Sequence, residues 1–153
     1  MIGGGLELAC AAHIRVAEPS TYFALPEGQR GIFVGGGGSV RLPRLIGVAR
    51  MADMMLTGRV YSATEGSAFG FAQYLVEDGG ALPKAMELAE KISGNAPLTN
   101  FAVLQALPLI AEANPQTGLL MESLMATVAQ SDQEAKRRIR AFLDHKTAKV
   151  KPT

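Results

Sequence analysis

Apolar and polar residues follow two different patterns along this chain. Up to about residue 80, short apolar stretches alternate with turns that contain glycine and proline. Short runs of this kind predict strands, which we expect at residues 13–17, 22–25 and 71–76. Helical spacing predicts helices at residues 4–12, at 48–56 and at 63–69, and another that starts near Ser39 and carries Arg41 and Arg44. This first part is therefore predicted to be mixed α/β.

From Leu82 onward, apolar residues recur with the period of amphipathic helices. We expect helices at residues 82–92, at 98–113 with a break at Pro108, around 119–128, and around 139–143 after Asp132. The sequence thus divides into a mixed α/β region at residues 1–80, a helical region at 81–146 and a polar tail at 147–153.

Two helix starts carry local signals. Ser62 followed by Glu65 three residues later resembles a capping box. Ser39 is the expected N-cap of the helix near residue 40. Because proline fits the first turn of a helix, Pro43 is expected close to that start.

Composition narrows the classes of protein that fit. The chain has 153 residues, of which 48% are hydrophobic and 19% charged, with a net charge of +1. These values predict one soluble globular domain without an electrostatic partner such as nucleic acid or an anionic membrane. The single cysteine, Cys10, forms no disulfide within the chain and indicates a reducing compartment. No segment has the apolar length of a membrane span, so we expect a cytoplasmic protein.

Two glycine clusters raise the question of a phosphate or anion site. Neither the cluster at residues 3–5 nor the one at 35–38 fits a P-loop or a dinucleotide-binding turn. Four adjacent glycines cost chain entropy, so the second cluster indicates a local demand of the backbone. At residues 3–5, exposed N–H groups at a helix start could hold an oxyanion. A plain glycine turn is the alternative.

Single residues say little about function by themselves. Glu7 is either a charge at a helix start or a catalytic group, and Glu27 is either a loop charge or a catalytic group. Cys10 is expected to be a small buried hydrophobic residue. No metal site or catalytic triad is expected, because His13 and His145 lie far apart and lack ligands at suitable spacing. Ser39 also lacks a nearby base.

Several motifs, in order, carry a resemblance to a known family. They are GGGLELA at residues 3–9, FALPE at 23–27, GIFVGGGGSVRL at 31–42, LTGR at 56–59 and GFA at 70–72. Together they resemble the crotonase (enoyl-CoA hydratase/isomerase) superfamily, from Met1 to about Lys146. The resemblance implies a crotonase-like spiral ββα core, here its C-terminal part, followed by a helical trimerisation region. Val34 departs from the family, which usually has proline there.

The resemblance also implies roles for individual residues. Gly4 matches the glycine whose N–H forms half of the oxyanion hole, while Glu7 and Glu27, 20 positions apart, match the two catalytic glutamates. Gly35 matches a glycine of the water site. The remaining expected site residues are the lining residues Leu25, Pro26 and Phe33, and the coenzyme A contacts Phe142 and Lys146.

The implied activity is addition of water to a 2-enoyl-CoA thioester, in which coenzyme A is part of the substrate and no separate cofactor is needed. Two carboxylates that hold one water can supply both the nucleophile and the proton. A crotonase-fold isomerase or another CoA-thioester enzyme is the alternative within the family. The chain starts abruptly at a glycine turn, which favours a second alternative: a truncated, non-catalytic chain or a subunit that needs an N-terminal partner. The implied assembly is a homotrimer or a dimer of trimers.

Overall fold

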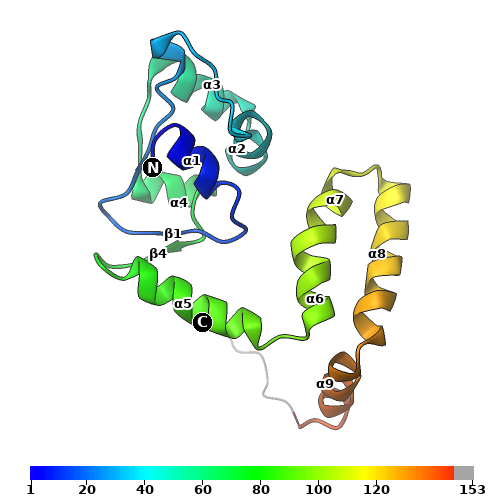
Figure 1. Cartoon of the computed structure of the whole chain (residues 1–153). Helices are drawn as coiled ribbons and strands as arrows, with labels where there is room; N and C mark the ends of the chain where they lie inside the picture. The colour runs from blue at the N-terminus through cyan, green and yellow to red at the C-terminus, as the bar shows by residue number, and fades with distance from the viewer. Residues whose placement is uncertain (147–153) are drawn as a thin grey trace. The chain divides into compact units, whose positions relative to one another are not determined.

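The structure is a computed structural model that describes residues 1–146, and it consists of two compact units (Figure 1). The first unit ends at Leu88 and the second begins at Ala89, inside helix α5 (Ala81–Ser93). The boundary predicted at residues 80 and 81 lies at the start of this helix, eight residues before the division between the units.

The first unit is built from short helices and two-residue strands. Its helices are α1 (Gly4–Ala9), the 3-10 turn η1 (Gly28–Arg30), α2 (Gly38–Ile46), α3 (Val48–Thr57) and α4 (Ala63–Phe69). Its strands are β1 (Val16–Ala17), β2 (Tyr22–Phe23), β3 (Tyr61–Ser62) and β4 (Tyr74–Leu75). β1 pairs with β4 in parallel, and β2 pairs with β3 antiparallel. The predicted strands exist, but each is shorter than expected.

The core of the first unit joins α1, α2 and α3 to the strands. Its fully buried side chains are Leu6, Phe23, Leu25, Leu42, Ile46, Met54 and Phe71. The rings of Phe23 and Phe71 stack with centroids 4.5 Å apart and an angle of 8° between their planes. This contact ties β2 to the segment before β4, so two parts of the chain that are distant in sequence share one core.

The start of α2 differs from the prediction. Gly37, with φ of +90°, caps the helix instead of Ser39, and Pro43 lies inside the helix instead of in its first turn. Proline cannot donate to the carbonyl four residues earlier. α2 ends soon afterwards, and the N–H of its C-cap, Gly47, donates to the Pro43 carbonyl at 2.9 Å.

The second unit contains the predicted helices. They are α6 (Pro97–Phe101), the π-helical segment η2 (Ala102–Ala106), α7 (Leu107–Glu112), α8 (Pro115–Ser131) and α9 (Gln133–Leu143). Near the break predicted at Pro108, the helix has the π-helical segment η2, which ends two residues before the proline. Wider π turns are one way in which a helix adapts locally. α7 packs beside α8 (Figure 1).

Apolar surface remains on the α6–α8 part of the second unit. Leu119, Leu124 and Val128 of α8 are all exposed. A pocket of about 270 Å³ lies between η2, α7 and α8, lined mainly by apolar side chains such as Phe101, Leu109 and Leu124. Among residues 1–146, no helix combines the length and apolar character that crossing a membrane requires.

Candidate active site

The start of α1 is fixed by pairing with the segment after β2. The Gly3 N–H donates to the Ala24 carbonyl at 3.0 Å, and the Ala24 N–H donates to the Met1 carbonyl at 3.2 Å. Gly3 then turns the chain into α1 with φ of +51°, a conformation that favours glycine. Since Ala24 lies three positions before Glu27, this pairing brings the second candidate acid to the beginning of the helix that carries the first.

Glu27 lies against this turn. Its side chain is only 9% exposed, and a β-carbon on Gly3 would come within 2.5 Å of its Oε1. Its Oε2 is buried and has no hydrogen-bond partner among the residues that the structure describes. Buried polar atoms normally have a partner, so this oxygen is available to a water or to a substrate group.

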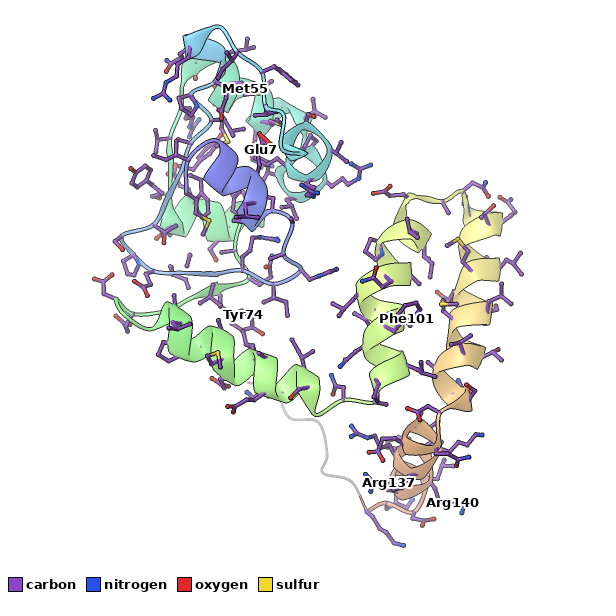
Figure 2. All side chains as sticks on the ribbon, in the orientation of Figure 1. Glu7, Met55, Tyr74, Phe101, Arg137 and Arg140 are labelled. Carbon is purple, nitrogen blue, oxygen red and sulfur yellow. The ribbon has the colours of Figure 1, made fainter. Side chains whose placement is uncertain are left out.

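Glu7 is buried more deeply, at 3% exposure, between α1 and α2 (Figure 2). Its Oε2 accepts a hydrogen bond from the Gly38 N–H at 3.2 Å. A β-carbon on Gly36 would come within 2.5 Å of the same oxygen, and one on Gly38 within 2.8 Å of the Glu7 Cγ. The backbone demand predicted for the second glycine cluster therefore has a cause: the Glu7 carboxylate occupies the space of two missing side chains.

Gly4 and Gly35 both face open space. No atom lies within 4 Å of the position that a β-carbon on either residue would take. Gly4 is the first residue of α1, and none of the hydrogen bonds among residues 1–146 uses its N–H. A group of this kind can donate to a carbonyl oxygen on which negative charge develops.

The predicted lining residues differ in their surroundings. Leu25 is fully buried in the core, and Pro26 is half-buried. Phe33 is exposed and lines an apolar pocket of about 350 Å³ together with residues of α2 and α3, among them Pro43, Met51 and Met55. Phe33 thus borders a cavity.

The two predicted coenzyme A contacts belong to the second unit. Phe142 is exposed near the end of α9. The Lys146 Nζ pairs with Asp144 Oδ2 at 3.2 Å. Their roles stay predictions, because the two units are described separately.

Arg15 is a buried residue of this unit that the sequence reasoning missed. Its Nε donates to the Phe71 carbonyl at 2.6 Å, and its Nη1 donates to the Ala12 carbonyl, just beyond α1. Burial lowers the pKa of the guanidinium. The available signal was its place within the apolar segment at residues 13–17, where an arginine that points inward needs buried acceptors.

A reactive cysteine and a metal site find less support in the structure. Burial raises the pKa of the Cys10 thiol, which disfavours the reactive thiolate. Among residues 1–146, no three His, Cys, Asp or Glu side chains lie close enough together to hold a metal ion.

Comparisons with known proteins show which family the chain belongs to. The family model described as enoyl-CoA hydratase/isomerase matches residues 1–152. A crystal structure of a candidate enoyl-CoA hydratase from Rhodopseudomonas palustris CGA009 is 84% identical, with a TM-score of 0.90, over 97% of this chain and 58% of that one. YngF of Bacillus subtilis (strain 168), a candidate enoyl-CoA hydratase/isomerase, is 34% identical over 98% of this chain and 58% of its own length.

A third relative is the enoyl-CoA hydratase EchA19 of Mycobacterium tuberculosis (strain ATCC 25618 / H37Rv), which is 41% identical over 69% of this chain and 40% of its own length. The chain therefore spans 58% of the length of YngF and of the R. palustris protein. The family match nevertheless extends over almost the whole chain, and the backbone agrees with the solved structure. This chain belongs to the enoyl-CoA hydratase/isomerase family and has the crotonase fold, represented by its C-terminal part and the helical region that follows.

Proposed function

We propose that this chain carries the two catalytic acids of an enoyl-CoA hydratase, which adds water across the double bond of a 2-enoyl-CoA thioester. The observation that supports it most is the pair of buried carboxylates around the start of α1, one of which has an oxygen without a partner. Two acids that are kept from bulk solvent beside open backbone N–H groups suit general acid–base chemistry on a bound water.

We assign a different role to each acid, and their surroundings support this assignment. Glu7, held by the Gly38 N–H, activates the water, whose oxygen bonds to the β-carbon of the thioester. Glu27, with its free Oε2, holds the same water and relays the proton to the α-carbon. The carbonyl oxygen becomes an enolate during the addition, and the Gly4 N–H stabilises that charge.

The reaction needs no bound cofactor, because the thioester of coenzyme A is part of the substrate. Phe33 and its pocket would contact the acyl group, and Phe142 and Lys146 would contact coenzyme A. The exposed apolar residues of α8 would be covered in a homotrimer or a dimer of trimers. Light scattering coupled to size-exclusion chromatography measures that state directly.

A direct assay follows the loss of absorbance of the conjugated thioester when crotonyl-CoA is hydrated. We would assay the 153-residue chain alone and a fusion of it to the part of the R. palustris protein that lies outside the match. The family's second oxyanion donor is expected in that part, and losing one such donor typically costs about a hundred- to a thousandfold in rate. We therefore expect the fusion to be the active form.

Separate replacement of the two acids tests the mechanism. Glu7→Gln and Glu27→Gln should each remove most of the hydratase activity of the fusion. Glu77→Gln, at an exposed position of the same unit, is the matched control and should remain active. Full hydration by either site variant would refute the mechanism with two carboxylates.

An isomerase remains the competing activity within the family, since YngF is named as a hydratase/isomerase. Moving a double bond between a 3-enoyl and a 2-enoyl thioester needs one acid that removes and returns a proton. Turnover of a 3-enoyl-CoA that survives one of the two glutamine substitutions, together with failure to hydrate crotonyl-CoA, would favour the isomerase.

A further inference from the structure

The loop at residues 35–38 is held by a residue to which neither the motifs nor the proposed mechanism gives a role. Arg41, in α2, donates from Nη1 to the Gly36 carbonyl at 2.9 Å. Its backbone N–H donates to the Gly37 carbonyl at 3.1 Å. The bond to Gly36 comes from the side chain, whereas the bond to Gly37 is a regular backbone bond at the start of α2.

The guanidinium also covers the loop backbone. A β-carbon on Gly37 would collide with the Arg41 side chain, with the Cζ 2.9 Å away. Gly37 has φ of +90°, which side chains rarely adopt. The backbone conformation therefore calls for glycine at this position, and the Arg41 guanidinium lies directly against it.

The same loop holds Glu7 through its neighbouring residues. The Gly38 N–H donates to Glu7 Oε2 at 3.2 Å, and the Gly36 Cα lies against the carboxylate. The three glycines at residues 36–38 therefore contact both Arg41 and Glu7. We call these three residues the glycine bridge. Glycine is the most flexible residue in an unconstrained chain, so this bridge needs an external constraint to keep one conformation.

We infer that Arg41 is a positioning residue, which fixes the glycine bridge so that the Gly38 N–H holds the Glu7 carboxylate in its reactive orientation. Hydrogen bonds from a charged donor are stronger than neutral ones, and the bond to Gly36 restrains the backbone of this loop. A displacement of about 1 Å at a reacting group can cost on the order of a hundredfold in rate. The inference rests on the proposed function, since it gives Glu7 a reaction to perform.

The test compares three variants of the fusion protein. Arg41→Gln removes the charged donor, and Arg41→Lys keeps the charge but not the planar guanidinium. Arg44→Gln makes the same change one turn further along α2, where the guanidinium bonds to the Val40 carbonyl inside the helix. We expect Arg41→Gln to lower kcat by roughly tenfold or more with little change in KM, Arg41→Lys to recover part of the loss, and Arg44→Gln to match the parent protein.

A second measurement does not depend on activity. Amide hydrogen exchange by NMR reports whether the Gly38 N–H is still held, and it should become faster in Arg41→Gln but not in Arg44→Gln. Thermal unfolding of the same samples shows whether each variant is folded. An Arg41→Gln protein with unchanged Gly38 exchange would overturn the inference, as would an unchanged kcat in an active fusion.

The two proposals can fail separately. If the parent fusion does not hydrate crotonyl-CoA, the proposed function fails, and the exchange of Gly38 still decides whether Arg41 fixes the loop. If the parent is active and Arg41→Gln is equally active, the proposed function stands and the role of Arg41 is refuted.

Discussion

Glu27 lies against the backbone of Gly3, and a β-carbon at that glycine would come within 2.5 Å of the carboxylate Oε1. The contact joins two segments, because Gly3 begins the turn into α1 and Glu27 begins the turn η1. Only a residue without a side chain leaves room for the Glu27 carboxylate at this position. The glycine is thus required both by its own conformation and by its neighbour.

This contact predicts a clear difference between two glycine substitutions. Gly3→Ala places a methyl group on the carboxylate and forces alanine to φ of +51°, so it should lower the free energy of unfolding by roughly 1–3 kcal/mol. Gly5→Ala lies inside α1 with no atom within 4 Å of its new methyl group. It should leave the stability unchanged or raise it by up to about 1 kcal/mol. Urea denaturation of both variants measures the difference, and equal stabilities would contradict it.

A second glycine tests the packing around Glu7. Gly36→Ala would bring a β-carbon within 2.5 Å of Glu7 Oε2 and 3.2 Å of its Cδ. Because the side chain can yield, we expect the carboxylate to move and hydration of crotonyl-CoA by the fusion to fall on the order of a hundredfold.

Gly35→Ala is the folding control for that variant, because no atom lies within 4 Å of the position of its new methyl group. Its thermal unfolding should match that of the parent protein. Undiminished hydration by Gly36→Ala would show that the contact with Glu7 has no catalytic consequence.

Local signals in the sequence predicted part of this structure well. The capping box at α4 forms as expected: the Ser62 Oγ accepts from the Glu65 N–H at 3.3 Å, and Glu65 Oε2 accepts from the Ser62 N–H at 2.9 Å. All the atoms involved lie within four residues, so the pattern contains the whole interaction. The break at Pro108 was predictable for the same reason, although its π-helical form was not.

Features that depend on distant residues could not be predicted in this way. Ser39 is a good N-cap by its type, yet α2 begins earlier, where the Gly38 N–H meets Glu7 from 31 positions away. Spacing along the chain likewise gave no reason for both acids to be buried. Their positions came from the family resemblance. In the structure, Glu7 packs against Gly36 and Gly38, and the pairing of Gly3 with Ala24 brings Glu27 to the start of α1.

We expect the buried side chain of Arg15 to contribute to the free energy of unfolding. Arg15→Met removes the donors to the carbonyls of Phe71 and Ala12, and a buried carbonyl without a donor costs about 1–3 kcal/mol. We expect the free energy of unfolding to fall by at least this amount. Arg44→Met, at an exposed position, should change it by no more than about 0.5 kcal/mol. Denaturation with urea compares the two, and equal losses would show that the buried hydrogen bonds contribute nothing specific.

The last prediction concerns the ion pairs of α9, the helix on which Figure 2 labels Arg137 and Arg140. Hydrogen bonds from Arg137 and Arg138 lower the pKa of Glu134 from 4.5 to about 2. Because the folded state has the lower pKa, the stabilisation is complete above about pH 4.5 and is lost as the pH falls through about 2. These side chains are partly exposed, so added salt should weaken the effect.

NMR titration of the Glu134 carboxyl carbon tests this directly. In Arg137→Gln, the carboxylate loses the contacts with Arg137 Nε and Nη2, at 2.8 and 2.6 Å, so its pKa should rise toward 4.5. Arg140→Gln is the matched control, since no hydrogen bond among residues 1–146 joins Arg140 to Glu134, and it should leave the titration nearly unchanged. If both variants titrate like the parent, Arg137 does not lower the pKa of Glu134. The lowered pKa would then depend on the hydrogen bond from Arg138.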